Sequence, residues 1–220
     1  MIRFARAVGV GAMAVVSLPG IAGAAEGWSA ANTAPSRLDV QLSDLQRVYG
    51  GGYRFLIGRS IPNSQITATS IITGMSLARD ALHGRKGGYI VEYVRKNGTT
   101  LNKGKLSVLP GLGSVAGAVN AYRNRVGPTL VVRDALHYRI SNPAGLSYRI
   151  TALNGVGDAA ALHRYTSIQP HGIPTAYDAI VVFRRGNYTA SLNFSSYKTL
   201  NLGQAIQVAR MVDNRIKQAR

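Results

Sequence analysis

The pattern of apolar and polar residues is clearest in the last third of the chain. Residues 179–183 form a continuous apolar run, which is typical of a strand buried on both faces. Residues 188–195 then alternate between apolar and polar side chains, which indicates a strand covered on one side only. Arg185-Gly-Asn187 lies between the two runs and has the composition of a hairpin turn. The pattern therefore predicts a β-hairpin near the C-terminus.

A terminal helix is predicted directly after this hairpin. Asn201 can cap its first turn, with Gln204 three residues further on. Basic residues at 215, 217 and 220 suit the negative end of its dipole. Apolar residues recur along it at helical spacing, at Leu202, Ile206, Ala209, Val212 and Ile216.

The rest of the chain mixes the two periodicities. Helices are predicted over 39–49, with Asp39 as the cap, from Pro62-Asn63 to about His83, and over 114–125. Strands are predicted over 53–57, 88–95, 105–109, 129–134, 137–140, 146–152 and 160–168, with a turn at 155–158. The mixture predicts an α+β domain with an antiparallel or mixed sheet and helices packed on it.

The N-terminus has the pattern of an export signal. Residues 1–6 are basic, residues 7–18 are uncharged and mostly apolar, and Ala22-Gly-Ala24 supplies small residues for cleavage. We expect a signal peptide over 1–24, an extended leader over 25–38 and a single domain over 39–220. The alternative is an uncleaved membrane anchor, although its Gly, Ala and Pro content makes the apolar drive weak.

Charge and cysteine content limit the function classes. The 220 residues contain 26 Lys and Arg against 9 Asp and Glu, a formal net charge of +17, which falls to +15 when Arg3 and Arg6 are removed with the signal peptide. Such a charge suits binding to a polyanion or an anionic surface, but without a dense basic run a merely basic surface is the favoured interpretation. The absence of cysteine excludes disulfides, thiol catalysis and a lipid-modified N-terminal cysteine. We therefore expect an exported bacterial protein that is not a lipoprotein, with nucleic acid not an expected partner.

A glycine-rich segment matches the spacing of a dinucleotide-binding site, which would make the protein an enzyme. Gly111, Gly113 and Ala116 match the G-x-G-x-x-G/A spacing of a dinucleotide-binding turn, and Asp134 would bond the ribose. Pro110 interrupts the passage from strand to turn, the C-terminal hairpin does not suit a doubly wound sheet, and an exported protein would meet little nicotinamide cofactor. We keep a dinucleotide-dependent oxidoreductase as an alternative and expect no cofactor.

Other catalytic signatures are missing from the sequence. The four histidines are scattered without metal-binding spacing, no G-x-S-x-G elbow occurs, and the nine carboxylates stand singly. We therefore name no catalytic and no metal-binding residue, and expect the protein not to be an enzyme.

The C-terminal half resembles a known group of domains. The residues that carry the likeness are Gly155-Val-Gly-Asp-Ala-Ala160, the segments 177–187 and 209–216, and more weakly 63–66 and 84–89. Their layout is similar to that of PsbP/Mog1-like and kinase-sensor extracytoplasmic domains of bacteria. The resemblance implies an α/β/α-type sandwich around an antiparallel sheet, and supplies no catalytic residues.

Three functions follow as expectations. The first is a non-enzymatic exported domain that binds a ligand or partner in the cell envelope. The second is the oxidoreductase that would use the Gly111–Ala116 turn. The third is a basic domain that binds a polyanion or anionic surface, with binding that weakens steeply as salt is added.

Overall fold

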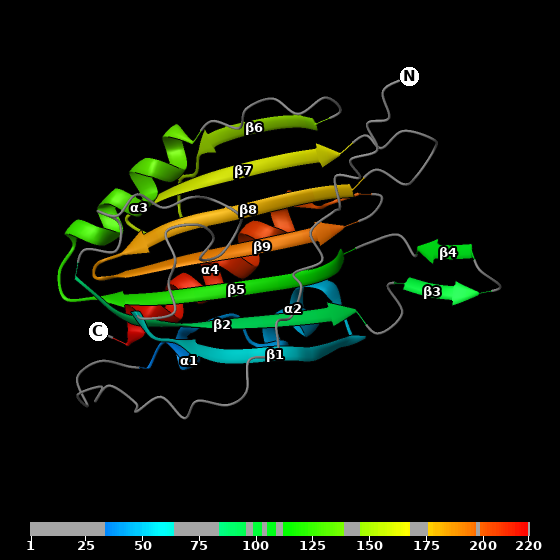
Figure 1. Cartoon of the computed structure of the whole chain (residues 1–220), viewed down its shortest axis with the longest axis horizontal. Coiled ribbons are helices and arrows are strands. Elements are labelled where there is room, and N and C mark those ends of the chain that lie inside the picture. The colour runs from blue at the N-terminus through cyan, green and yellow to red at the C-terminus, as the bar shows by residue number, and fades with distance from the viewer. Residues whose placement is uncertain are drawn as a thin grey trace, which may run out of the picture.

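A single antiparallel sheet forms the centre of the molecule (Figure 1). The computed structural model describes residues 34–63, 84–95, 99–102, 105–108, 112–138, 146–167, 176–196 and 199–219. Within these ranges seven strands pair in the order β1-β2-β5-β9-β8-β7-β6. Their bounds are β1 Tyr53–Ile61, β2 Arg85–Arg95, β5 Leu112–Tyr122, β6 Leu146–Ala152, β7 Ala159–Ser167, β8 Ala176–Arg185 and β9 Tyr188–Ser196. A separate hairpin of β3 (Thr99–Asn102) and β4 (Lys105–Val108) extends beyond one end of the sheet.

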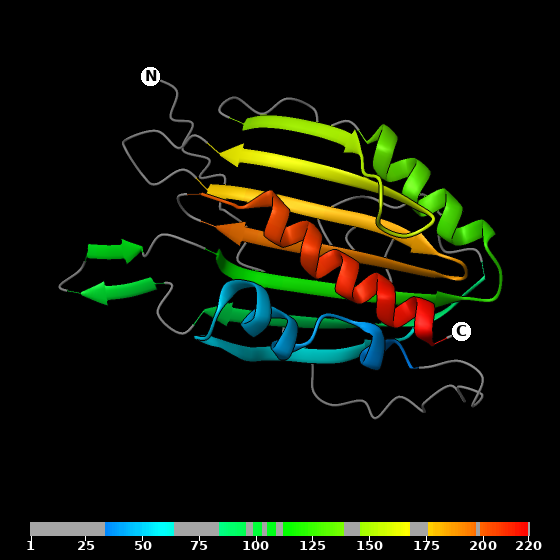
Figure 2. The same ribbon diagram turned by 180° about the vertical axis from the view of Figure 1, so that it is seen from behind.

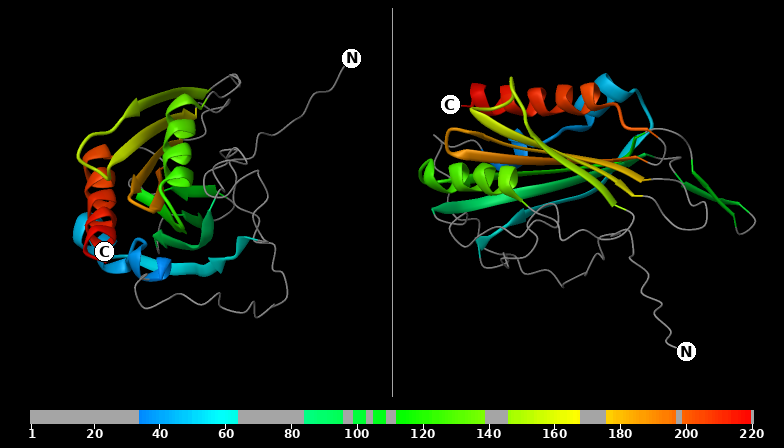
Figure 3. Two further views of the ribbon diagram at one scale, coloured as in Figure 1. Left: turned by 90° about the vertical axis from the view of Figure 1, so that its left-hand side faces the viewer. Right: turned by 90° about the horizontal axis from the view of Figure 1, so that it is seen from above.

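Helices lie on both faces of the sheet. Three of them, α1 (Pro35–Leu38), α2 (Leu42–Tyr49) and α4 (Leu202–Gln218), pack on the face that we call the α4 face (Figure 2). The fourth, α3 (Val126–His137), packs across β6, β7 and β8 on the opposite side, the α3 face (Figure 3). The sheet thus separates two hydrophobic cores.

The larger core lies beneath α4. The helix buries one stripe of its surface, made of Ala205, Val208, Ala209, Val212 and Ile216. These residues meet the inward side chains of the central strands, among them Phe183, Leu192 and Phe194, which are fully buried. The smaller core joins Val131, Val132 and Ala135 of α3 to Ala161, Ile180 and Val182 of the sheet.

The hairpin and the helix predicted at the C-terminus are confirmed, but β9 is buried on both faces instead of one, since its polar residues Thr189 and Ser191 are 2% and 5% exposed. The hairpin joins β8 to β9 through a turn at Gly186, whose φ of 57° lies in the left-handed region that glycine adopts most readily. The predicted cap is present too, because Asn201 Oδ1 accepts a hydrogen bond of 3.2 Å from the Gln204 backbone N–H. The predicted antiparallel sheet is also confirmed, although it makes up most of the structure and the helices are few.

Two central predictions are wrong, and for opposite reasons. Residues 114–125 do not form a helix, because most of them belong to strand β5, in which Val115, Val119 and Ala121 face the larger core at period two. Residues 129–134 do not form a strand, because they lie inside α3, where Val131, Val132 and Ala135 bury one side of the helix. Ala residues had favoured a helix, and β-branched residues a strand, but burial against the neighbouring elements decided both.

Smaller differences concern the chain ends and the termini of elements. Asp39 does not cap α2; the cap is Gln41, whose N–H donates to Asp44 Oδ2 at 2.8 Å, and Asp39 itself is fully buried. The last four residues of the expected extended leader form α1. His137 ends α3 instead of opening a strand. The expected signal peptide, most of the leader and nearly all of the helix expected to end near His83 lie outside the described residues.

Candidate ligand-binding groove

The glycine-rich segment does not form the strand–turn–helix unit that a dinucleotide site requires. Gly113 and Ala116 lie within β5, while Asp134 lies on α3. Gly111 is outside the described residues. A dinucleotide fingerprint needs a strand, a tight turn and then a helix whose N-terminus faces the pyrophosphate. A continuous strand from Leu112 to Tyr122 offers no helix N-terminus at this place.

Several residues that carry the family resemblance form an ion-pair network. Asp213 of α4 accepts hydrogen bonds from Arg185 Nε at 2.7 Å and from the Gly157 N–H at 2.9 Å. Asp158 accepts from Arg185 Nη1 at 2.8 Å and from the Gly186 N–H at 2.7 Å. The Asp213 hydrogen bond, together with both carboxylates, raises the pKa of Arg185. The network joins the β6–β7 loop, the β8–β9 turn and α4, so these sequence motifs hold the fold together.

The groove that we identify as the candidate site lies on the α4 face, near the start of α4. Its volume is about 370 Å³, and it is open to solvent. Its floor follows from the strand register, in which Ser147, Thr166 and Tyr177 form one cross-strand row and Arg149, Arg164 and Ala179 the next. The lining residues are Ser147, Arg149, Arg164, Tyr165, Thr166, Tyr177, Asp178, Leu200 and Leu202. We call this hollow the arginine groove.

Arg149 and Arg164 give the groove its charge. They are direct cross-strand partners in the β6–β7 ladder, so their side chains leave the same face of the sheet next to each other. Among the described residues, no carboxylate forms an ion pair with either arginine; the ion pairs engage Arg133, Arg184, Arg185 and Arg215. Like charges in directly opposite positions destabilise a sheet, and a bound anion would remove that repulsion.

The carboxylate of Asp178 belongs to the other face of the sheet. It accepts a hydrogen bond of 2.5 Å from Ser195 Oγ. Ser195 follows Phe194, whose side chain is buried on the α4 face, and successive side chains of a strand point to opposite faces, so Ser195 points to the α3 face. Asp178 therefore contributes to the arginine groove through its backbone. The side chains that reach the groove supply guanidinium groups and hydroxyls, which can all donate hydrogen bonds.

The rim of the groove is fixed by the connection from β9 to α4. Ser196 Oγ donates to the Thr199 carbonyl at 2.6 Å, and Asn201 then caps α4. These two bonds position Leu200 and Leu202, which pack partly on the larger core. Since the first turn of α4 contains no acidic residue, nothing in that turn neutralises the positive end of its dipole.

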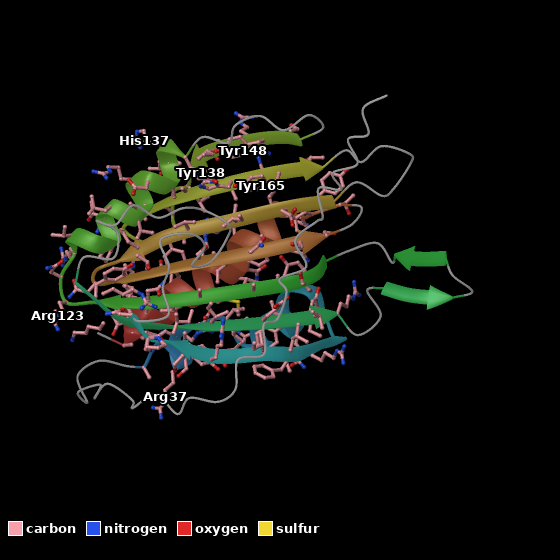
Figure 4. The ribbon with its side chains drawn as sticks, in the orientation of Figure 1. Arg37, Arg123, His137, Tyr138, Tyr148 and Tyr165 are labelled. Carbon is pink, nitrogen blue, oxygen red and sulfur yellow. The ribbon has the colours of Figure 1, made fainter. Side chains whose placement is uncertain are left out.

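A cluster of aromatic residues occupies the α3 face behind the groove. Figure 4 shows Tyr138, Tyr148 and Tyr165 gathered where the end of α3 meets β6 and β7. They surround His163, which is fully buried and whose Nδ1 lies 3.3 Å from the Tyr165 hydroxyl. Burial lowers the pKa of His163 to about 4, with the Ala135 carbonyl partly opposing it, so the imidazole is neutral at pH 7.

Next to this cluster lies a polar strip on the same face. Burial raises the pKa of Asp178, and the Ser195 hydroxyl opposes this shift. Burial also raises the pKa of Glu92. Ser191 Oγ and Asn193 Oδ1 are buried without a hydrogen-bond partner within the described part of the chain. The strip is rich in hydrogen-bonding groups, but the open volume that we describe lies on the α4 face.

The sequence analysis did not single out Arg149 or Arg164. A signal was present, because both lie in predicted strands that flank a predicted turn. Arg149 lies seven residues before Val156 and Arg164 seven residues after Gly157, so a symmetric hairpin about this turn brings them together. The sequence does not show whether its basic residues form one patch, because that depends on the fold; this pair concentrates charge at one place.

Metal-binding clusters and membrane-spanning helices are both absent from the described residues. They contain no group of three or more His, Asp and Glu side chains placed to hold a metal ion. No helix among them has the length and apolar character needed to cross a membrane.

Comparison with known proteins supports the fold. No protein-family model and no curated protein matches the sequence. Among solved structures, the chain is similar to the extracellular domain of PknH from Mycobacterium tuberculosis, with a TM-score of 0.52 and 12% sequence identity. The match covers 85% of this chain and 98% of that domain. At this identity the similarity establishes a shared fold and leaves the ligand open.

Proposed function

We propose that this protein is an exported binding domain that holds an anionic group of its ligand in the arginine groove. One observation carries the proposal. Arg149 and Arg164 stand side by side in an open hollow of about 370 Å³, without a carboxylate partner among the described residues.

The chemistry of the groove suits phosphate or carboxylate. A guanidinium group presents its N–H donors in a planar fork that matches two oxygens of either anion. Two such forks side by side can hold an anion from two directions, while the hydroxyls of Ser147, Thr166 and Tyr177 add donors along the next row. The proposed role is recognition, because the groove side chains include no general base.

Two features support a location outside the cytoplasm. The N-terminus has the charge and apolar pattern of a signal peptide. The fold is similar to that of the extracellular domain of PknH. The proposal is tested by fractionating the native cells and measuring the intact mass. A chain starting near Ala25 outside the cytoplasm is expected, and a full-length chain inside the cytoplasm would contradict export.

The groove itself is tested by titrating the ¹⁵N-labelled mature protein with inorganic phosphate at constant ionic strength. Amide shifts should move first around Arg149, Arg164 and Thr166. The double variant Arg149→Gln/Arg164→Gln should weaken binding about tenfold or more, because it removes both charged donors.

The matched control is Arg37→Gln/Arg123→Gln, which removes the same charge from two exposed residues. Figure 4 shows both side chains away from β6 and β7. This variant should bind phosphate as the wild type does. Equal weakening in both variants would mean that the overall charge of the protein, and not the groove, attracts the anion.

A further inference from the structure

A second hollow lies on the other side of Leu200. Its volume is about 180 Å³, and it is lined by Tyr49, Tyr53, Arg95, Thr199, Leu200, Asn201 and Gln204. Leu200 is the residue that this hollow shares with the arginine groove. The two hollows therefore flank the same short connection between β9 and α4, at the end of α4 remote from the C-terminus in Figure 2. We call the second hollow the Arg95 pocket.

Arg95 supplies the charge of this pocket. It ends β2 and is the register partner of Tyr53, the first residue of β1. Its charge acts on the Tyr53 phenol: burial raises the pKa of Tyr53 to about 12, and Arg95 opposes the rise. No ion pair engages Arg95 within the described residues. The pocket thus presents a guanidinium group without a carboxylate partner there.

The wall opposite Arg95 is held in place by the start of α4. Gln204 Nε2 donates a hydrogen bond of 2.8 Å to the Val48 carbonyl, the acceptor left free near the end of α2. The Gln204 backbone N–H bonds Asn201. The Gln204 amide N–H is therefore engaged within the fold, and Arg95 is the positively charged group among the residues that line the pocket.

We infer that the arginine groove and the Arg95 pocket are two subsites for one ligand that carries two anionic groups. One group lies between Arg149 and Arg164, the other meets Arg95, and the segment that joins them passes over Leu200. The inference rests on the proposed function, because it assigns a second contact to the same ligand. Leu200 suits this position, since a partly buried apolar side chain gives the uncharged middle of such a ligand a surface to cover.

Binding both groups of one molecule makes the second contact intramolecular. The gain appears as a higher affinity for the two-headed molecule than for its one-headed counterpart. The test compares octane-1,8-bisphosphonate with orthophosphate, and suberate with acetate, by calorimetry at constant ionic strength. These pairs also show whether phosphate or carboxylate is the preferred anionic group.

The decisive variant is Arg95→Gln, with Lys86→Gln on the same strand as the charge-matched control. We expect Arg95→Gln to lower the affinity for octane-1,8-bisphosphonate or suberate about tenfold and to leave that for orthophosphate and acetate unchanged. Lys86→Gln should change neither, and Arg149→Gln/Arg164→Gln should weaken both. Thermal unfolding of each variant confirms that the fold is retained.

The possible failures are distinguishable. If Arg95→Gln leaves the two-headed affinity unchanged while the one-headed anions still depend on Arg149 and Arg164, the second subsite is refuted and the proposed function stands. If neither orthophosphate nor acetate depends on those two arginines, both the proposed function and the second subsite are refuted.

Discussion

At the scale of single residues, the burial of His163 determines its protonation state. The ring is fully buried among Tyr138, Tyr148 and Tyr165. A charged imidazole would be costly at this place, which is why burial depresses its pKa to about 4. The scattered spacing of the four histidines does not reveal this burial.

This burial predicts a loss of stability in mild acid. An unfolded histidine has a pKa of about 6.5, so below that pH the unfolded chain takes up a proton that the folded chain refuses. The contribution of neutral His163 is present above pH 6.5 and falls by roughly 3 kcal/mol as the pH drops to 4. Urea unfolding of the wild type and of His163→Gln between pH 7 and pH 4 measures it. The two stability curves should converge in acid, and parallel curves would show that His163 does not titrate as described.

At the scale of elements, the reliability of sequence interpretation depends on whether local pattern and tertiary packing agree. They agree in β8 and α4, where the apolar run and the helical stripe match the observed burial. In β9 the alternation correctly predicts the side chains that face the larger core, but it does not predict that the polar face is buried too. Local pattern and packing disagree in β5, whose Ala residues favour a helix locally. Small residues are needed in this strand because α1 and the residues after it approach the strand closely: a side chain at Gly117 would collide with Asp39 and Val40.

Gly117 therefore offers a test of this explanation. Gly117→Ala should destabilise the protein by about 1–3 kcal/mol, because the added methyl group overlaps the Asp39 carboxyl and the Val40 side chain. Gly51→Ala is the matched control, since nothing lies within 4 Å of its added carbon and its φ is ordinary. Chemical denaturation of both variants measures the difference. Equal stability of the two would mean that the helix α1 region does not press on β5.

At the scale of the whole molecule, distant segments are held together by the Asp158, Arg185 and Asp213 network. The sequence contains these residues in recognisable motifs, but it does not show that they meet, because 28 residues separate Arg185 from Asp213. The arginine groove is likewise formed by segments whose meeting the sequence does not show. Each strand of its floor could be predicted, whereas the meeting of the β6–β7 ladder with the start of α4 depends on the complete sheet order.

Removing Asp213 should destabilise the whole fold. Its side chain is 7% exposed and bonds both Arg185 and the Gly157 N–H, so Asp213→Ala removes one of the two carboxylates that pair with Arg185 and the acceptor of the Gly157 N–H. We expect a loss of about 3 kcal/mol in the free energy of unfolding. Asp134→Ala breaks the Arg133 pair, whose arginine is 55% exposed, and should cost less than about 1 kcal/mol. A small and equal loss in both variants would show that the network does not stabilise the fold.

The central claim is that the arginine groove binds an anion, and a crystal of the protein soaked in tungstate tests it most directly. Tungstate is a tetrahedral oxyanion with strong anomalous scattering, so its position can be seen without assumptions about the natural ligand. The account predicts an anomalous peak between the guanidinium groups of Arg149 and Arg164. An empty groove in a crystal whose tungstate lies on exposed arginines such as Arg37 and Arg123 would contradict it.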